Sequence, residues 1–485
     1  MTAREKPAIL WFRQDLRLDD HPALHAAAAN GRVVQPVFIL DDAAEGEWAS
    51  GGAGRWWLHH SLEALGTQLR RIGAPLLLQR GATADGLVKL AKELGAGSVH
   101  CSQRFEPAGP AQEECVRSAL AAVGVSFAAH AGALLHDPAV LRTGSGVPYK
   151  VYTPFAKSLR AHVAIGDPLP APRALPSVAQ RPAGCTLESL GLLPTFDWAG
   201  SMQGRWTPGE LGAQKRLAAF MAQPMRDYGE ARDIPAQDGS SSLSPHMHWG
   251  EISPRRVWSD VSRSDAGKSS GASKFLAEIL WREFAAHVLC NFPATASKPL
   301  RPEFAKFPWQ PSTKHLRAWQ RGQTGYPIVD AGMRQLWATG WMHNRVRMIV
   351  ASFLVKHLLQ SWQEGARWFW DTLCDADLAS NTLGWQWSAG CGADAAPYFR
   401  IFNPILQGEK FDPDGEFVRR WVPELAKVPS EFIHQPWEAP PMVLASSGVL
   451  LGETYPRPIV DHPTARERAL AALQKISSGK SAARD

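Results

Sequence analysis

The stretch Asp375–Trp387 combines residue types that could act on a bound molecule. It reads D-A-D-L-A-S-N-T-L-G-W-Q-W, with two carboxylates close together, an asparagine one helical turn further on and two tryptophans flanking a glutamine. A buried carboxylate without a partner costs free energy, so acids in such an apolar setting need partners. Each residue alone fits a capped loop with core tryptophans. The whole set instead indicates a site for a flat, electron-rich ligand.

The composition narrows the class of protein. A chain of 485 residues is long for one core and predicts two or three domains. The six cysteines are scattered without a C-x-x-C pair, so no zinc site, iron–sulfur cluster or other metal site is predicted. No apolar run is long enough to span a bilayer and no signal peptide is recognisable, so we expect a monomer in the reducing cytoplasm.

Charge and aromatic content suggest possible partners. The formal net charge of +6 is compatible with a polyanionic partner, although net charge alone defines no site. Tryptophan outnumbers tyrosine by 20 to 6. The excess fits either a bulky core or a protein that uses indoles for stacking and electron transfer.

Short apolar runs alternate with helical patterns at the start of the chain. Such alternation predicts a parallel, doubly wound, Rossmann-like sheet in an α/β domain over residues 5–135. No G-x-G-x-x-G follows the first strand, so no dinucleotide is expected here. The expected strands are 7–14, Val33–Leu40, Pro75–Gln79 and Ser98–Ser102, and the expected helices are Trp56–Ile72 and Thr83–Leu94.

The remainder of the chain has a different pattern. Residues 136–208 are predicted to be an interdomain linker, since Asp167–Pro208 is rich in Pro, Gly, Ala and Ser and lacks periodicity. Residues 209–475 have helical spacing and predict an all-α domain, and the polar residues 476–485 predict a disordered tail. The clearest expected helices are Ser273–Leu289, Ala331–Leu359 and Thr464–Gln474.

Four stretches together resemble the DNA photolyase and cryptochrome family. They are W-F-R-Q-D-L-R-L-D-D-H-P-A-L (Trp11–Leu24), Y-K-V-Y-T-P-F (Tyr149–Phe155), Asp375–Trp387 and G-A-D-A-A-P-Y-F-R-I-F-N-P (Gly392–Pro404). The resemblance extends from Trp11 to about Leu425. It implies an α/β antenna domain followed by an all-α domain that binds FAD, reduced in the active form.

The resemblance also implies which residues hold FAD. In the family, the region of G-S-S-S-L-S-P (Gly239–Pro245) grips the pyrophosphate, whereas the residues alone fit an N-cap with a flexible loop. Arg347 is a natural partner for the buried Asp375. By resemblance, Asn381 lies beside flavin N5, where plant cryptochromes generally have an aspartate. The asparagine favours a role in repair over a role in signalling. The implied cofactor-binding residues are Tyr228, Ser240, Ser241, Ser242, Leu243, Ser244, Phe275, Arg282, Arg347, Asp375, Ala376, Asp377 and Asn381.

A second set of residues is implied to contact a DNA lesion. Glu278, Trp281 and Arg282 share one helical face, which alone fits a surface ion pair beside a packed indole. By resemblance, Trp281 stacks on a flipped pyrimidine dimer, Glu278 hydrogen-bonds its base edge and Trp387 forms another stacking wall. Asn344 and Met348 resemble the cyclobutane-dimer photolyases, because (6-4) photolyases carry a histidine pair in this region.

Further roles follow from the same resemblance. Trp385, Trp362 and Trp309 match the electron-transfer chain of the family in the contexts L-G-W-Q-W, Q-S-W-Q-E-G and F-P-W-Q. Arg232, Arg345 and Arg400 are expected to hold DNA phosphates in a salt-sensitive way that does not depend on sequence.

The resemblance predicts a cyclobutane pyrimidine dimer photolyase. Three alternatives stay open: a cryptochrome photoreceptor, a photolyase that prefers single strands, and a nucleic-acid-binding flavoprotein without photochemistry. An antenna chromophore is expected in the α/β domain. The folate-binding glutamate of the best-known bacterial class would fall near Gly109, so that form of the folate site is expected to be absent. The run R-W-W-L-H-H-S-L (Arg55–Leu62) instead resembles class III photolyases and plant cryptochromes, and it favours methenyltetrahydrofolate bound in another arrangement. A deazaflavin, or no antenna, is the alternative.

Overall fold

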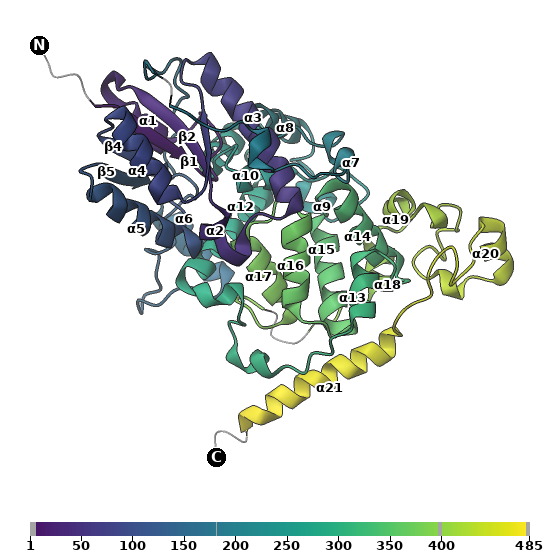
Figure 1. The fold of residues 1–485 in the computed structure, drawn as a ribbon. Coiled ribbons are helices and arrows are strands. Elements are labelled where there is room, and N and C mark those ends of the chain that lie inside the picture. The colour runs from purple at the N-terminus through teal and green to yellow at the C-terminus, as the bar shows by residue number, and fades with distance from the viewer. Residues whose placement is uncertain (1–5, 181, 396–399, 482–485) are drawn as a thin grey trace, which may run out of the picture. The chain divides into compact units, whose positions relative to one another are not determined.

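The computed structural model describes residues 6–180, 182–395 and 400–481 (Figure 1). Its contacts divide the chain into two compact units. The first unit comprises Met1–Arg226, Ser241–Pro293 and Cys374–Leu378, and the second comprises Asp227–Ser240, Ala294–Leu373 and Ala379–Asp485. The domain boundaries expected after residues 135 and 208 stay predictions, and both fall inside the first unit.

A parallel sheet of five strands forms the centre of the first unit, in the order β3-β2-β1-β4-β5. This order is the doubly wound arrangement that the alternating pattern predicts. The strands are β1 (Ala8–Phe12), β2 (Val34–Leu40), β3 (Leu77–Arg80), β4 (Ser98–Ser102) and β5 (Ser126–His130). The first four lie where the apolar runs predicted them. Strand β5 was not predicted; it lies at the edge of the sheet, and none of its residues is fully buried.

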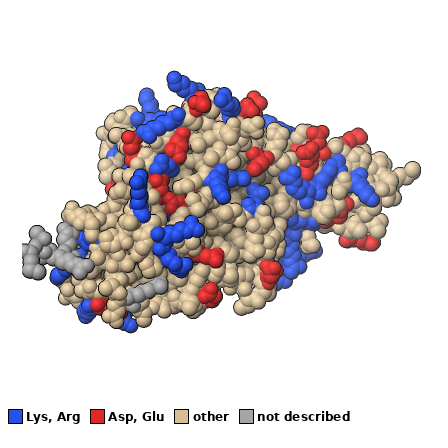
Figure 2. All heavy atoms as spheres, turned by 90° about the horizontal axis from the view of Figure 1, so that it is seen from above, with Lys and Arg blue, Asp and Glu red and all other residues tan. Residues whose placement is uncertain are grey.

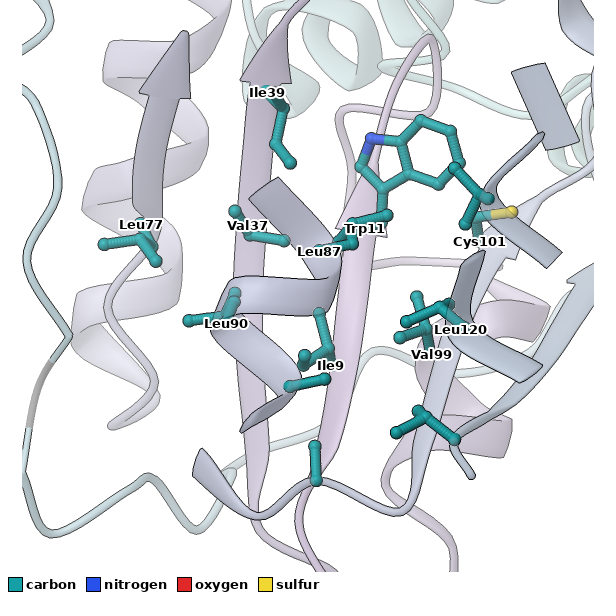
Figure 3. Packing of buried hydrophobic residues seen from close by; sticks show 14 residues of the cluster. Ile9, Trp11, Val37, Ile39, Leu77, Leu87, Leu90, Val99, Cys101 and Leu120 are labelled. Atoms are coloured by element: carbon teal, nitrogen blue, oxygen red, sulfur yellow. The ribbon is translucent and has the colours of Figure 1, made fainter. Parts of the chain in front are cut away.

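Both faces of this sheet are covered by helices. Alternate strand residues point to opposite faces, so Ile9 and Trp11 of β1 share one face with Val37 and Ile39 of β2. Helices α4 (Thr83–Leu94) and α5 (Ala108–Ala121) pack on this face, for example through Leu87 (Figure 3). Helix α1 (Pro22–Ala27) contacts β1 and β4. Coverage of both faces explains why β1 and β2, near the centre of the sheet, are almost continuously apolar.

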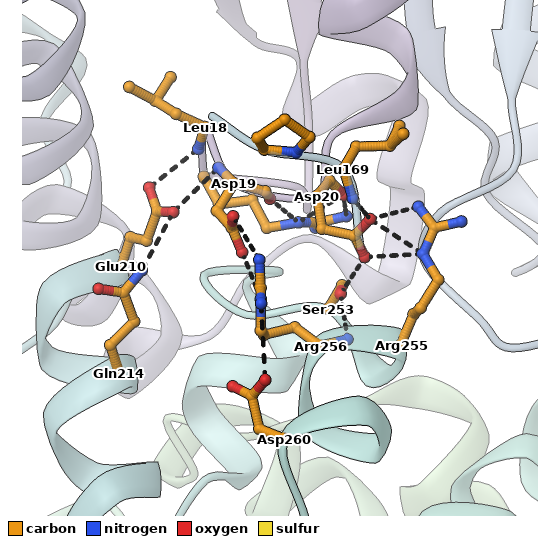
Figure 4. A network of polar contacts seen from close by, with 12 residues as sticks. Leu18, Asp19, Asp20, Leu169, Glu210, Gln214, Ser253, Arg255, Arg256 and Asp260 are labelled. Carbon is orange, nitrogen blue, oxygen red and sulfur yellow. Dashed lines mark hydrogen bonds and ion pairs between the residues drawn. The ribbon is translucent and has the colours of Figure 1, made fainter. Parts of the chain in front are cut away.

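The loop after β1 is held by arginines of helix α11 (Pro254–Arg263), as Figure 4 shows. Arg255 donates from Nε to both oxygens of Asp20 at 2.9 and 3.0 Å, and the Ser253 hydroxyl donates to the same carboxylate. Arg256 donates two bonds of 2.8 Å to Asp19. The loop therefore depends on residues more than 230 positions away in the sequence.

The same loop is fixed from two other directions. The buried carboxylate of Glu210 accepts the backbone N–H groups of Leu18 and Asp19, each at 2.9 Å. Burial raises the pKa of Glu210. Arg17 donates to the Gly250 carbonyl at 2.9 Å. The stretch Trp11–Leu24 thus attaches the sheet to residues 249–256, which begin four residues after the serine-rich segment of the candidate site.

Removing the Asp20 carboxylate is expected to destabilise the protein. Asp20→Ala leaves Arg255 and Ser253 without their shared acceptor, and we expect a loss of about 2 kcal/mol in the free energy of unfolding. The measurement is chemical denaturation followed by circular dichroism. Asp260→Ala is the matched control, because Asp260 forms a half-exposed pair with Arg256 at 3.5 Å and is expected to contribute about 0.5 kcal/mol. Equal losses in the two variants would contradict this assignment.

The first unit contains further helices that cover the sheet or carry candidate site residues. The expected helices at 56–72, 83–94 and 273–289 are confirmed as α3, α4 and α12. The helices not yet given are α2 (Asp42–Glu45), α3 (Gly52–Arg71), α6 (Tyr152–His162), α7 (Gly200–Gln203), α8 (Glu210–Ala222), α10 (Ser244–His248) and α12 (Ser270–Asn291).

The second unit is helical in its described residues. Its α-helices are α9 (Tyr228–Ala231), α13 (Thr313–Gln320), α14 (Pro327–Thr339), α15 (Asn344–Ser352), α16 (Trp362–Thr372), α17 (Leu378–Ala389), α18 (Pro404–Phe411), α19 (Glu416–Trp421), α20 (Pro441–Ser447) and α21 (His462–Ser481). Helix α21 runs past residue 475, where the helical domain was expected to end. Among all described helices, none has the length and apolarity needed to cross a bilayer.

The expected single helix Ala331–Leu359 is wrong, because the chain is broken inside it. Gly340 takes the left-handed conformation, with φ of 65°, and ends α14. His343 then caps α15, and a π-helical turn over Phe353–His357 follows. The apolar spacing continues across the break because α14 and α15 pack against each other. The periodicity therefore predicted the helices correctly but not their separation.

Candidate functional site

The candidate site residues fall into both units. The first unit contains Ser241, Ser242, Leu243, Ser244, Phe275, Glu278, Trp281, Arg282, Asp375, Ala376 and Asp377. The second unit contains Tyr228, Arg232, Ser240, Trp309, Asn344, Arg345, Arg347, Met348, Trp362, Asn381, Trp385, Trp387 and Arg400.

The serine-rich segment forms a tight turn. Ser242 has a φ of 49°, an uncommon conformation for a residue with a side chain. Its hydroxyl is buried without a hydrogen-bond partner among the described residues, whereas the Ser241 hydroxyl accepts the Leu243 N–H at 3.3 Å. Arg216 donates to the Ser241 carbonyl at 3.0 Å and holds the turn from outside. A strained turn with a buried, unsatisfied hydroxyl has the character of a site for a polar ligand group.

The two aspartates of the stretch Asp375–Trp387 lie in a turn just before α17. The Trp249 indole N–H donates to the Cys374 carbonyl at 3.1 Å and fixes the start of this turn. His248 is buried nearby, and burial lowers its pKa, whereas Asp377 and Asp375 act in the opposite direction. Sequence analysis missed His248. The run S-P-H-M-H-W-G directly after the serines was the available signal.

Helix α12 forms a rigid mount for four candidate residues. Phe275 is buried against Phe220, with ring centroids 4.6 Å apart, whereas Glu278 and Trp281 are partly exposed. Arg282 donates to the carbonyls of Ala133 and Met247 at 3.2 and 3.3 Å. The helix is thus anchored by its apolar residues while the polar candidates stand at its rim.

In the second unit, Trp385 packs against helix α16. Its ring makes edge contacts with Phe369 at 5.0 Å and with Trp319 at 6.2 Å. A Cβ added at Gly365 would overlap the Trp385 ring, so this position has room only for glycine. One turn earlier on α17, the Asn381 amide donates to the Ala366 carbonyl at 3.1 Å. That bond orients the amide and leaves its oxygen as an acceptor.

The structure also brings together the segments that carry Trp362 and Trp309. Trp362 is buried at the start of α16. The backbone N–H of Gln310, next to Trp309, donates to the Leu359 carbonyl at 2.8 Å, and Gln360 returns a side-chain bond of 2.7 Å to the Gln310 carbonyl. Trp309 itself is partly exposed. The three indoles of the predicted chain therefore lie on adjoining segments that end toward the surface.

Trp319, which was not singled out from the sequence, lies beside Trp385. It is fully buried, and its indole N–H donates to the Val350 carbonyl at 3.0 Å. Nothing in its local sequence distinguishes it from the other tryptophans.

Helix α15 presents Asn344 and Met348 one turn apart. Asn344 is exposed and Met348 is partly exposed, so both can meet a ligand. Arg345, between them, forms an ion pair with Asp233 at 2.8 Å and lies 3.9 Å from the Met348 sulfur. Arg347 donates to the Met342 carbonyl at 2.8 Å. Its predicted pairing with Asp375 would join the two units and stays a prediction.

The other candidates of the second unit have fewer described contacts. The Arg232 guanidinium lies 5.3 Å from the centre of the buried Tyr228 ring, and the exposed Arg400 lies 5.2 Å from the Phe402 ring. Trp387 is partly exposed. Within the predicted motif Gly392–Pro404, residues 396–399 lie outside the described part of the chain.

The cap of α15 makes the stability of the protein depend on pH. Burial lowers the pKa of His343 to about 4, against an ordinary value of 6.5, and Asp233 acts in the opposite direction. The ring accepts the Arg345 N–H through Nδ1, which protonation would prevent. Since the unfolded state takes up a proton that the folded state refuses, this stability is present above pH 6.5 and is lost as the pH falls toward about 4.

We expect His343→Asn to reduce this dependence, because asparagine also caps helices but does not titrate. Between pH 7 and pH 5, the loss of unfolding free energy should be about 2 kcal/mol smaller in the variant than in the parent. Thermal unfolding at a series of pH values measures the difference. Identical pH profiles would mean that His343 is not protected from protonation in the folded state.

Charged side chains of both signs are visible on the face drawn in Figure 2. In the view of Figure 2, Lys and Arg are distributed among Asp and Glu rather than gathered into one patch. The formal net charge is +6.

Comparisons with known proteins agree with the geometry of both units. The family model for DNA photolyase matches residues 8–174, and the model for the FAD-binding domain of DNA photolyase matches residues 275–475. A deoxyribodipyrimidine photo-lyase of Agrobacterium fabrum is 50% identical over 98% of this chain and 99% of its own. Cryptochrome-2 of Arabidopsis thaliana is 39% identical over 97% of this chain and 79% of its own.

A solved structure agrees over almost the same length. A bacterial class III photolyase from Agrobacterium tumefaciens superposes with a TM-score of 0.95 at 48% identity and covers 99% of each chain. The predicted fold class, an α/β domain followed by a helical FAD-binding domain, is confirmed. Together with the matched residue ranges, this places the chain in the DNA photolyase family.

Proposed function

We propose that this protein is a deoxyribodipyrimidine photo-lyase that uses light to split cyclobutane pyrimidine dimers in DNA. The observation that carries the proposal is the 50% identity, over almost the full length of both chains, with a protein of that name. The cryptochromes that also match are less similar, at 35–39%. Asn344, Met348 and Asn381 agree with the repair assignment, because each has the residue type that the resemblance associates with dimer repair.

The residues of the chain fit FAD. The buried, unpartnered hydroxyl of Ser242 and the strained turn around it suit a pyrophosphate oxygen. The amide oxygen of Asn381 is left over as an acceptor and suits a flavin N–H group. When bound in its reduced form, FAD supplies the electron that light makes available to the dimer. Tyr228, Phe275, Arg282, Arg347 and Asp375–Asp377 complete the proposed cofactor site, with Ser240, Ser241, Leu243 and Ser244 of the serine turn.

The remaining residues bind and orient the lesion. Photolyases extrude the base on which they act, and an extruded pyrimidine pair needs aromatic surfaces and hydrogen-bond partners in place of its neighbours. Trp281 and Trp387 supply the surfaces, and Glu278 and Asn344 supply polar groups. Helix α12 holds Glu278 and Trp281 one turn apart on a rigid mount. The tryptophans Trp385, Trp362 and Trp309 would restore the reduced cofactor from the surface.

DNA phosphates are assigned to three arginines. Arg400 is exposed and Arg232 is partly exposed, so both can reach a backbone phosphate. Arg345 is already paired with Asp233, so a phosphate would have to compete with that carboxylate. Binding should weaken with salt on damaged and undamaged DNA alike.

Illumination of the purified protein with dimer-containing DNA tests the proposal. We expect the lesion to disappear under blue light and to persist in the dark, with no net oxidation of the flavin. A duplex and a single-stranded substrate, compared at equal lesion concentration, determine strand preference. Light-driven flavin reduction without any loss of the lesion would instead support a cryptochrome, and a protein that stays colourless when supplied with FAD would end the proposal.

An antenna in the first unit is part of the proposal, with methenyltetrahydrofolate favoured. At Gly109 an added Cβ would lie 2.6 Å from the Arg104 Cβ, so the folate-binding glutamate of the best-known bacterial class has no room there. In the Arg55–Leu62 run of α3, Trp56 contacts His60 at 4.8 Å, and His59 and His60 each have a buried ring nitrogen without a hydrogen-bond partner in the described chain. These groups suit a flat heterocycle with polar edges.

Reconstitution distinguishes the possible antennae. Protein purified without chromophore is mixed with methenyltetrahydrofolate or with a deazaflavin, and near-ultraviolet excitation of flavin photochemistry is measured. The favoured chromophore is supported if the folate sensitises the parent protein and this sensitisation is lost in Trp56→Ala. Sensitisation by the deazaflavin alone would exclude it.

A further inference from the structure

Tyr152 and Trp281 form a close parallel stack in the first unit. Their ring centroids lie 3.7 Å apart and the ring planes differ by 4°. Tyr152 is the first residue of α6 and Trp281 lies in the middle of α12. Aromatic pairs in proteins are more often offset or edge-to-face, at 4.5–7 Å. The two planes are thus matched more closely than ordinary core packing requires.

The Tyr152 hydroxyl is tied to the backbone beneath Trp281. It donates to the Ala277 carbonyl at 2.8 Å. In an α-helix this carbonyl also accepts the N–H of the residue four positions later, which here is Trp281. One phenol therefore contacts both the indole plane and the backbone from which the indole projects. Rotation of the ring about χ2, which is otherwise broad for tryptophan, is restricted.

Buried aromatic rings support this stack from below. Phe284 makes edge contacts with Tyr152 at 6.0 Å and with Trp281 at 5.9 Å. Phe155, one turn after Tyr152, lies 5.2 Å from Phe284, and both phenylalanines are fully buried. Tyr152 and Trp281 themselves are partly exposed. The partly exposed pair therefore packs on a layer of fully buried aromatic rings.

We infer that Tyr152 is a positioning residue that orients Trp281 for the lesion. The inference rests on the proposed function, in which Trp281 stacks on the extruded dimer. Tyr152 covers one face of the indole and directs the pyrimidine to the other. Because the ring plane is fixed before DNA arrives, binding does not have to immobilise it. Tyr152 should therefore contribute to affinity for the lesion and leave the light-driven step unchanged.

The test measures dissociation constants in the dark by fluorescence anisotropy, with dimer-containing and undamaged oligonucleotides. Tyr152→Leu removes the stack and is expected to weaken binding of the dimer about tenfold, within the range found for base–aromatic stacking. Tyr152→Phe keeps the stack and loses the hydroxyl, and about a threefold loss is expected. Affinity for undamaged DNA and repair per absorbed photon at saturating substrate should equal those of the parent in both variants.

Tyr149→Leu is the matched control. Tyr149 belongs to the same segment but packs on His287 and Phe155, each with ring centroids 6.1 Å apart. The Tyr149→Leu variant is expected to bind the dimer with the affinity of the parent. A merely structural contribution of this segment would instead lower affinity for both kinds of DNA in Tyr149→Leu and Tyr152→Leu alike.

A double-mutant cycle decides whether Tyr152 acts through Trp281. In a Trp281→Ala background, Tyr152→Leu and Tyr152→Phe should cause no further loss. Parent-like dimer affinity of both Tyr152 variants, or equal losses with and without Trp281, would overturn the inference. If Tyr152→Leu does not fold, Tyr152→Phe in the two backgrounds gives the same decision. If Trp281→Ala itself binds the dimer as the parent does, the role of Trp281 in the proposed function fails instead.

Discussion

Trp385→Phe is expected to abolish light-driven reduction of oxidised FAD in this protein. Trp385 is buried against α16, one turn from Asn381, and is the proposed first donor to the flavin. Phenylalanine preserves most of the packing but is far harder to oxidise than an indole. A decrease of at least about 100-fold in the rate is expected, equivalent to a barrier increase of about 2.7 kcal/mol. Loss of the oxidised-flavin absorption under blue light, with an external reductant present, measures this rate.

Two comparisons make this result specific to Trp385. Trp437→Phe changes a tryptophan of the same unit that contacts Tyr326 instead, and its photoreduction should be like that of the parent. Trp385→Phe supplied with chemically reduced FAD should still repair dimers, because the tryptophan restores the cofactor and does not contact the lesion. Undiminished photoreduction in Trp385→Phe would show that electrons enter by another route, for which the neighbouring Trp319 is the first residue to test.

Glu278→Ala is expected to reduce repair about 30-fold at low substrate concentration, as expected for the loss of one hydrogen bond involving a charged group. Glu278 lies at the rim of α12, one turn before Trp281, and is proposed to contact the base edge of the dimer. The variant should retain FAD, because none of the flavin contacts proposed here involves this carboxylate. Lesion loss per absorbed photon, measured together with flavin content, tests both expectations.

Glu278→Gln distinguishes the charge from the hydrogen bond. The amide keeps the length of the side chain and can still bond to a pyrimidine edge, so its repair should lie between that of the parent and that of Glu278→Ala. Ser273→Ala changes an exposed residue of the same helix and should have no effect. Unchanged repair in Glu278→Ala would remove this residue from the site while leaving the assignment of FAD intact.

Local patterns predicted much of the fold. The runs that became β1 and β2 are almost continuously apolar because both faces of the sheet are covered, and that property is visible in the sequence. Strand β5 was not predicted because none of its residues is fully buried, and its apolar run has only three residues. The break at Gly340 was not predicted, because the packing of α14 on α15 maintains helical apolar spacing on both sides of it.

The serine turn shows the same limit at the candidate site. The resemblance assigned this segment to the pyrophosphate of FAD, whereas its residues alone fitted an N-cap with a flexible loop. The positive φ and the buried hydroxyl of Ser242 are tertiary properties. Helix α10 after this turn has only five residues, so the hydroxyls and the turn itself, rather than a long helix dipole, are the groups offered to a phosphate. The resemblance to the family supplied the ligand class, and the folded chain determined which atoms are available.

The sequence by itself determined the order of the two domain types, the residue types of the candidate site and the family, because each depends on short motifs whose chemistry is local. The tertiary structure alone decided which residues support them. Tyr152 lies 129 positions before Trp281, and Gly365 lies 20 positions before Trp385. The local sequence around Tyr152 or Gly365 does not indicate which ring either residue contacts. Such contacts arise when distant helices pack together, and packing depends on the shapes of all the side chains at once.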